Sequence, residues 1–181
     1  GYGDNTTGNN SDAFPMDGSQ WLDSDNDGRG DNINGNDADI FPYDSSQWYD
    51  KDGDGYGDNP MGNDSDAFST DPTQWSDRDG DGYGDNEDGN NADAFPYDTT
   101  QHSDQDGDGY GDNSGGNSSD QCPDEAGSSR YRVNNDGSAI EWFGCPDSDN
   151  DQVPDDFDDC SNTAGTSYID QISCPDSDND A

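Results

Sequence analysis

Residues 50–59 read Asp-Lys-Asp-Gly-Asp-Gly-Tyr-Gly-Asp-Asn, and close copies of this run recur at an interval of 27 residues. Each copy places three Asp residues at alternate positions and a fourth after the glycines. Alternate residues of a tight loop direct their oxygens to one centre, and glycine lets the backbone wrap a hard cation. The repeat therefore predicts calcium binding. We call each copy an acidic loop and number the copies 1 to 4.

Each acidic loop predicts four carboxylate ligands and one backbone carbonyl ligand. Trp21, Trp48, Trp75 and His102 stand two residues before the loops and mark the same register. The predicted ligands are Asp23, Asp25, Asp27, Arg29 and Asp31 in loop 1, Asp50, Asp52, Asp54, Tyr56 and Asp58 in loop 2, Asp77, Asp79, Asp81, Tyr83 and Asp85 in loop 3, and Asp104, Asp106, Asp108, Tyr110 and Asp112 in loop 4.

Acids also keep register in the second half of each repeat. The twelfth position, where a helix-flanked calcium loop has a bidentate acid, is not kept: it holds Asn34, Met61, Asp88 and Gly115. The second-half acids must complete the first ion's shell or hold another ion, and about two ions per repeat would offset about four charges. These acids are Asp12, Asp17, Asp37, Asp39, Asp44, Asp64, Asp66, Asp71, Asp93, Asp98 and Asp120.

The composition argues against an ordinary apolar core. Only 23% of the 181 residues are hydrophobic, the net charge is −40 and the mean hydropathy is −1.42. Such a chain cannot offset its ordering entropy by burial, so we expect no fold without metal. A disordered acidic segment is the alternative. However, all 45 acids except Glu87, Glu125 and Glu141 are Asp, and most keep the repeat register.

The acidity also limits the partners. So negative a surface repels nucleic acid and anionic membranes, whereas divalent cations are its natural counter-charge. No run approaches the roughly 20 apolar residues that span a bilayer, so no direct membrane insertion is expected, and no signal peptide is recognisable. We expect an extracellular or cell-surface location, where calcium is abundant.

Four cysteines lie in the last third of the chain. Their even number in a chain with little core predicts two disulfides, for which three connectivities exist. We favour Cys122–Cys145 and Cys160–Cys174, because each closes a short loop and leaves an acidic loop outside it. A zinc site is less favoured, since the spacing lacks Cys-x-x-Cys.

The repeats predict a solenoid-like fold of mostly irregular loops wrapped around calcium ions, with short strands and one hairpin near 130–143. Asn134-Asn135-Asp136-Gly137 supplies the hairpin turn. The expected segments are 1–121 (27-residue repeats, with a partial copy over 1–20), 122–145 (a disulfide-closed hairpin insert) and 146–181 (cysteine-containing repeats, the last truncated).

The recurring Trp and Phe residues either pack between repeats or form an outward stripe for lateral association.

A different spacing governs the last segment, where Cys-Pro-Asp-Ser-Asp-Asn-Asp occurs at 145–151 and 174–180. We call residues 147–155 acidic loop 5, in which Gln152 replaces a glycine and so puts the site geometry in question. The predicted ligands are Asp147, Asp149, Asp151 and Asp155, and in the last copy Asp176, Asp178 and Asp180.

In these motifs the chain resembles the thrombospondin type 3 repeat family over most of its length. Gln-Trp-x-Asp-x-Asp-Gly-Asp-Gly-Tyr-Gly-Asp-Asn at 47–59 is similar to Asp-rich units of archaeal and bacterial surface proteins, and the cysteine motif to units of bacterial extracellular proteins. The resemblance implies calcium ions along an irregular backbone, disulfides that join the turns, and no catalysis.

The predicted function is that of an extracellular, calcium-rigidified rod or filament subunit. Asp4 at the start and Asp176, Asp178 and Asp180 at the end are two halves of one acidic loop, so head-to-tail contact would form a split calcium site; alternatively, both ends are accidental. The alternative structural interpretation is a stalk, spacer or adhesion module of a larger surface protein. Rival classes are a ligand-binding hairpin using Tyr131, Trp142 and Phe143, and an enzyme, for which no nucleophile and base pair exists.

Overall fold

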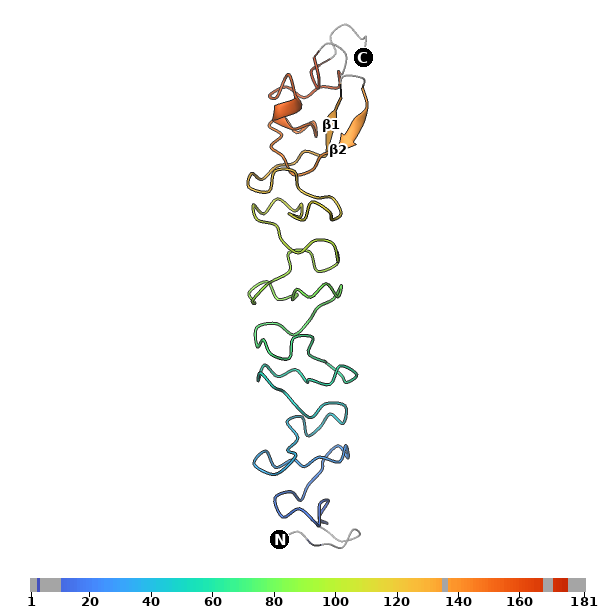
Figure 1. Ribbon diagram of the computed structural model, residues 1–181, viewed down its shortest axis with the longest axis vertical. Coiled ribbons are helices and arrows are strands. Elements are labelled where there is room, and N and C mark those ends of the chain that lie inside the picture. Colours follow the sequence, from blue (N-terminus) through green and yellow to red (C-terminus); the bar gives the residue numbers. More distant parts are fainter. Residues whose placement is uncertain (1–2, 4–10, 135–136, 168–170, 176–181) are drawn as a thin grey trace. The chain divides into compact units, whose positions relative to one another are not determined.

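Irregular loops make up most of the protein (Figure 1). The structure is a computed structural model that describes residue 3 and residues 11–134, 137–167 and 171–175. In these ranges the regular elements are strands β1 (Tyr131–Val133) and β2 (Ala139–Glu141) and the short 3-10 helix η1 (Asp155–Phe157). The expectation of an irregular, loop-rich fold with one hairpin is confirmed.

The chain forms two compact units. Unit 1 comprises Gly1–Asp77 and Gly84–Ala92, and unit 2 comprises Arg78–Tyr83 and Asp93–Ala181. Loops 1 and 2 therefore lie in unit 1, and loops 4 and 5 lie in unit 2. Loop 3 is divided, with Asp77 in one unit and Asp79 and Asp81 in the other.

The hairpin is antiparallel, with Tyr131 opposite Glu141 and Val133 opposite Ala139. Its rings pack within unit 2. The Trp142 ring meets the Phe157 ring edge to face, with 5.5 Å between centroids, and the Arg132 guanidinium lies 4.4 Å from the Phe157 centroid. These contacts attach the hairpin to η1.

A buried glutamine forms the centre of each 27-residue repeat. Gln47 is only 2% exposed, and its side chain makes three hydrogen bonds. Nε2 donates to the carbonyls of Asn59 (3.0 Å) and Asn63 (2.8 Å), and Oε1 accepts from the Asn59 amide (3.0 Å). Gln20, Gln74 and Gln101 repeat this pattern at the equivalent positions. A polar side chain thus performs the packing role that an apolar residue usually has.

Backbone hydrogen bonds join the two halves of a repeat. The Asp66 amide donates to the Gly57 carbonyl (2.9 Å), and Gly57 and Ser65 form a parallel bridge. The Ala67 amide then donates to the carbonyl of Trp75 (3.0 Å), the first residue of the next repeat. The second half of each repeat therefore runs beside the last residues of its own acidic loop.

The recurring aromatic residues pack between successive repeats. In loops 1 to 3 the seventh residue contacts the ring 19 positions further on. In unit 1 the Arg29 guanidinium lies 4.7 Å from the Trp48 centroid, and Tyr56 stacks on Trp75 at 5.1 Å. In unit 2, Tyr83 stacks on His102 (3.8 Å), whereas Tyr110 of loop 4 stacks on Phe143, 33 positions further on (5.2 Å). Trp48 and Trp75 therefore pack between repeats and do not form an outward stripe.

Disulfides appear where the 27-residue repeat ends. Cys122 is bonded to Cys145 and Cys160 to Cys174, the connectivity favoured from the sequence. Cys145, Cys174, Val153 and Pro154 are buried apolar residues in this part of the chain. Covalent closure and buried apolar side chains therefore replace the glutamine centre in the last part of unit 2.

Substitution of Gly57 tests the glutamine centre. A Cβ at Gly57 would overlap the side-chain amide of Gln47, whereas a Cβ at Gly18 would meet no atom within 4 Å. We expect Gly57→Ala to lower the free energy of unfolding by about 1–3 kcal/mol, as overpacking does. Gly18→Ala is the control and should change it little. Denaturant unfolding in excess calcium measures both, and equal stability of the two variants would contradict this packing.

Candidate metal centres

Backbone amides hold the carboxylates of each acidic loop in place. In loop 2, Asp50 accepts from the amides of Gly53 (2.6 Å) and Gly55 (2.9 Å). Asp52 Oδ1 accepts from the Asp54 amide (3.2 Å), and Asp54 Oδ1 from the Tyr56 amide (2.9 Å). The Oδ2 atoms of Asp52 and Asp54 are buried and have no hydrogen-bond partner. In Asp52 and Asp54, one oxygen therefore fixes the side chain and the other is available to a cation, whereas both oxygens of Asp50 accept backbone amides.

The same arrangement recurs in the other loops that lie within one unit. One carboxylate oxygen from each of the first three Asp residues lies within 4.8 Å of the other two. These triplets are Asp23, Asp25 and Asp27; Asp50, Asp52 and Asp54; Asp104, Asp106 and Asp108; and Asp147, Asp149 and Asp151. Each triplet can hold a metal ion.

Gln152 does not disturb the geometry of loop 5. Its φ of 81° lies in the left-handed region, as does the φ of 97° at the equivalent Gly55. The Gln152 amide donates to Asp147 Oδ2 at 2.8 Å, matching the bond from Gly55 to Asp50. The loop therefore keeps its conformation although glutamine has no intrinsic preference for it.

The fourth acid of a loop differs in its hydrogen bonding. Asp31 accepts from the amide (3.0 Å) and hydroxyl (2.6 Å) of Ser24, and Asp155 accepts similarly from Ser148. In loop 2 the equivalent of Ser24 is Lys51, and Asp58 Oδ1 is buried without a partner. The fourth acid is therefore positioned by serine in some repeats and left without a protein donor in loop 2.

One acid from the second half of each repeat joins the acidic loop. We call Asp39, Asp66, Asp93 and Asp120 the companion aspartates. Asp39 is 2% exposed, Asp66 8% and Asp120 4%. In these three, Oδ1 accepts the amide two residues on at 2.6–2.8 Å, and Oδ2 is buried with no partner. Buried carboxylates without counter-charge are unfavourable, which makes these oxygens candidate metal ligands.

Electrostatics place the companion aspartates beside the loop carboxylates. Burial, together with repulsion from Asp54, Asp52 and Asp58, raises the pKa of Asp66 to about 6. Burial likewise raises the pKa of Asp120 to about 6, with repulsion from Asp108, Asp106 and Asp112. The pKa of Asp39 is raised for the same reasons. Each of these companion aspartates is therefore close enough to three carboxylates of its acidic loop to be repelled by them.

Asp158 is the companion of loop 5, and the sequence reasoning missed it. Its Oδ1 accepts the Cys160 amide (2.7 Å), and its Oδ2 is buried without a partner. Burial raises its pKa, as does repulsion from Asp151, Asp149 and Asp155. The signal was present: Asp158 stands two residues before Cys160, as Asp120 stands before Cys122.

Other predicted second-half ligands have different surroundings. Asp37 and Asp64 are exposed and adopt φ values of 45° and 43°, a backbone role that Asn91 and Ser118 fill in later repeats. Asp44 accepts from the Ser46 amide and hydroxyl and from Asn63 Nδ2. The Ser46 hydroxyl lowers the pKa of Asp44 most, and Asp17, Asp71 and Asp98 have equivalent bonds and lowered pKa values. Asp17, Asp44, Asp71 and Asp98 thus accept hydrogen bonds that join successive repeats.

Some predicted ligands cannot be placed. Asp4, Asp176, Asp178 and Asp180 lie outside the described residues. The split site between chain ends therefore stays a prediction. Asp12 lies in the described part, and its Oδ1 accepts the Phe14 amide (2.8 Å), which is the bond that the companion aspartates make.

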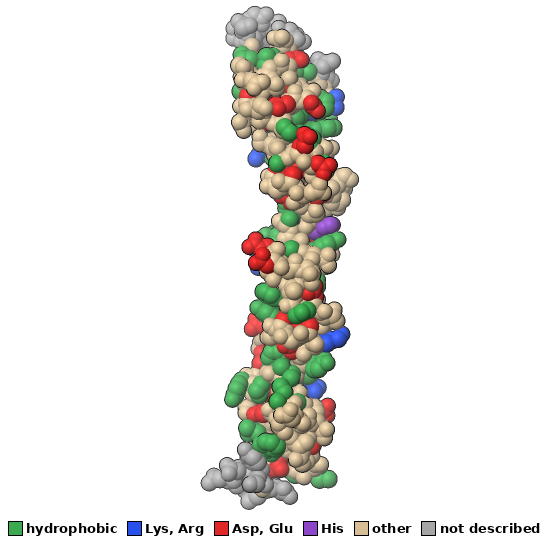
Figure 2. Space-filling view, turned by 90° about the vertical axis from the view of Figure 1, so that its left-hand side faces the viewer, with side chains coloured by type: hydrophobic (Ala, Val, Ile, Leu, Met, Phe, Trp, Pro, Cys, Tyr) green, Lys and Arg blue, Asp and Glu red, His purple; other side chains and the backbone are tan. Residues whose placement is uncertain are grey.

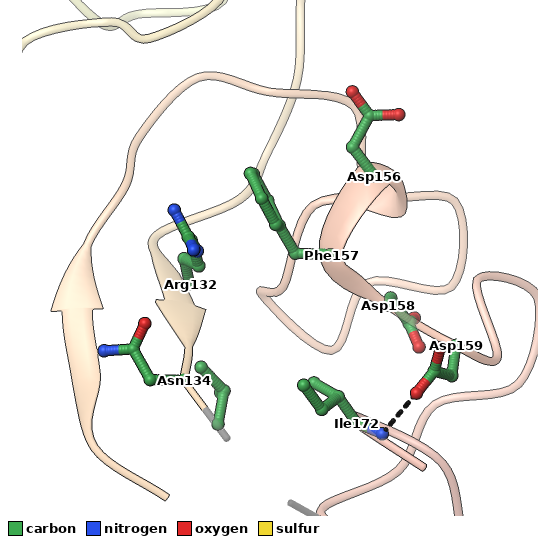
Figure 3. A pocket seen from close by; sticks show the side chains of 8 residues that line it. Arg132, Asn134, Asp156, Phe157, Asp158, Asp159 and Ile172 are labelled. Atoms are coloured by element: carbon green, nitrogen blue, oxygen red, sulfur yellow. Dashed lines mark hydrogen bonds between the residues drawn. The ribbon is translucent and has the colours of Figure 1, made fainter. Parts of the chain in front are cut away.

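A hollow of about 570 Å³ lies between the hairpin and η1, lined by Arg132, Phe157 and Ile172 among others (Figure 3). Asp159 closes one side, where its Oδ2 accepts the Ile172 amide at 2.9 Å. The rings of Trp142 and Phe143 pack against Phe157 and Tyr110. They are thus engaged in packing, which does not favour ligand recognition by these two rings.

Comparison with known proteins adds no relative: no family model matches the sequence, and no curated protein matches it. Within the described residues, no helix has the length and apolar character needed to cross a bilayer.

Lowering the pH should weaken calcium binding. The pKa of Asp66 and Asp120 is raised to about 6, so in the metal-free fold these groups hold protons that a cation must displace. Each such group should lower the calcium affinity of its centre about tenfold between pH 7 and pH 5. The stability of the metal-free fold should change oppositely, falling as pH rises from about 4 through 6.

Calorimetric calcium titrations at pH 5 and pH 7, in buffers of different ionisation enthalpy, measure the affinity and the protons released. An affinity that does not depend on pH over this interval, with no proton release, would contradict the shared centre.

Asp158→Asn tests the companion of loop 5. Replacing its carboxylate should cost the loop 5 centre at least about tenfold in affinity, as loss of a charged ligand does. Asp156→Asn removes the same charge from an exposed neighbour and is the matched control. At a calcium concentration that just saturates the parent protein, the number of ions bound per chain should fall in Asp158→Asn and stay unchanged in Asp156→Asn. Equal numbers of bound ions in the two variants would count against the assignment.

Proposed function

We propose that this chain is an extracellular calcium-binding structural repeat protein, in which bound ions complete the fold of each repeat. One observation carries the proposal: a buried companion carboxylate, whose Oδ2 has no hydrogen-bond partner, lies beside the acidic loop in loops 1, 2, 4 and 5. A divalent cation would supply the counter-charge that each cluster lacks.

Calcium fits the donor set best. The candidate ligands are carboxylate oxygens with a backbone carbonyl, and calcium accepts six to eight oxygens in flexible geometry, whereas magnesium requires a near-ideal octahedron and keeps its waters. The five acids of repeat 2 (Asp50, Asp52, Asp54, Asp58 and Asp66) carry five negative charges. Two ions sharing these carboxylates would offset about four of them. In this proposal the companion aspartate does not belong to a separate ion site. It joins the carboxylates of the acidic loop in one metal centre per repeat.

Ion binding would then supply folding free energy. The chain has 45 acids against 5 basic residues, so its metal-free form is destabilised by self-repulsion. Ions that bind only the folded form stabilise it by mass action. In this proposal the repeats form a solenoid-like array of the thrombospondin type 3 kind, which acts as a stiff stalk, spacer or filament element and not as a catalyst. The two disulfides suit an oxidising, calcium-rich exterior.

Removal of calcium with a chelator tests this proposal. Near-ultraviolet circular dichroism and tryptophan fluorescence should report loss of the stacked rings, such as Tyr56 on Trp75, as chelator lowers free calcium, and readdition of calcium should restore both signals. Magnesium at equal ionic strength is the control for charge screening and should not restore them. Signals that persist unchanged at nanomolar free calcium would contradict the proposal.

A further inference from the structure

Large apolar side chains are exposed mainly over one stretch of unit 1. Of the nine such residues in the described part of the chain, seven fall between positions 16 and 61. Two of them, Met61 and Tyr49, are 90% and 53% exposed. The seven residues are Met16, Leu22, Ile33, Ile40, Tyr43, Tyr49 and Met61. Ile40 and Tyr49 line one hollow, and we call the surface around this hollow the apolar face.

The repeat fold does not need these side chains. Ile40 is replaced by Ala67 and Ala94 in later repeats, and Tyr49 by Ser76 and Ser103. The backbone bond is nevertheless the same, from the amides of Ile40, Ala67 and Ala94 to the carbonyl at the start of the next repeat, at 3.0–3.1 Å. Since polar and small residues suffice for folding, the apolar residues of unit 1 have another use.

The hollow of the apolar face has a volume of about 380 Å³ and is lined by Arg29, Asp37, Ala38, Ile40, Trp48 and Tyr49. The Arg29 guanidinium covers the Trp48 ring, and Asp37 is exposed at the rim. Figure 2 shows hydrophobic side chains reaching the surface in groups among acidic ones. The hollow can therefore take a large apolar side chain next to a carboxylate.

We propose that the apolar face binds a cationic protein segment that carries large aliphatic or aromatic side chains. Charge selects this partner: nine of the twelve Asp in residues 16–61 are candidate metal ligands, but two ions leave each five-acid centre negative, and Asp17, Asp37 and Asp44 lie outside the centres, against Arg29 and Lys51 as the basic residues. An apolar side chain enters the hollow while a neighbouring Lys or Arg of the partner pairs with Asp37. A second copy of this chain, with its net charge of −40, is repelled from the same face.

Two short synthetic peptides of equal length and charge test the proposal. One contains Lys and Leu, and in the other each Leu is Ser, so that charge attraction is common to both. Fluorescence anisotropy with the full chain, in excess calcium and physiological salt, gives the two affinities. The Leu peptide should bind at least about tenfold more tightly, which corresponds to burial of one or two apolar side chains. Equal affinities would overturn the proposal.

Variants that copy the neighbouring repeat locate the site. The double variant Ile40→Ala and Tyr49→Ser installs the residues of positions 67 and 76, so charge and fold should be kept, and it should remove the preference for Leu. The converse variant, Ala67→Ile and Ser76→Tyr, should add binding of the Leu peptide. Circular dichroism in calcium checks the fold, and Tyr49→Ser alone gives a milder change that should lower the preference in part.

Three results count against the cationic partner. An unchanged preference in the double variant means that the apolar face is not the site. An unchanged affinity in the converse variant means that the hollow is not what selects apolar side chains. Reversible dimers of the parent chain in sedimentation equilibrium, absent from the double variant, mean that a second copy covers the face instead.

Discussion

The mutual repulsion of carboxylates held in one place is the constraint on which this structure depends. In repeat 2, backbone amides fix Asp50, Asp52 and Asp54 around one centre, and the chain then returns to bury Asp66 beside them. The buried oxygens of Asp52, Asp54 and Asp66 have no protein donor. Such a cluster is unfavourable without a counter-charge, and in the proposed function the ion would therefore be part of the fold.

Around each centre the repeat is built from polar contacts. Gln47 joins Asn59 and Asn63 through three hydrogen bonds, and Asp44 reaches Asn63 of the following repeat. Tyr56 links its acidic loop to the next repeat by stacking on Trp75. These bonds are directional and short in range, so they define a backbone path without an apolar core. They do not remove the electrostatic cost of the clustered carboxylates, which a bound cation would offset.

Much of this arrangement could be predicted from the sequence. The spacing of Asp50, Asp52 and Asp54 predicts convergent carboxylates, Asp136-Gly137 predicts the hairpin turn, and the spacing of the cysteines favours their pairing. The sequence could not separate Asp39 from Asp37 and Asp44, because all three keep register, although only Asp39 is buried beside the loop. It also left Asp158 unnoticed, because Asp158 follows Asp147, the first acid of its loop, by 11 residues, whereas Asp66 follows Asp50 by 16. Three-dimensional contacts, not periodicity, decide which acids share an ion.

Anomalous diffraction from crystals grown in calcium tests the central claim most directly, because it locates the ions themselves. The account predicts anomalous peaks in each centre about 2.3–2.6 Å from oxygens of the loop carboxylates and the companion aspartate, including Asp54 and Asp66. Ordered loops without such peaks at saturating calcium, or a protein donor bonded to Asp66 Oδ2 in place of an ion, would contradict it.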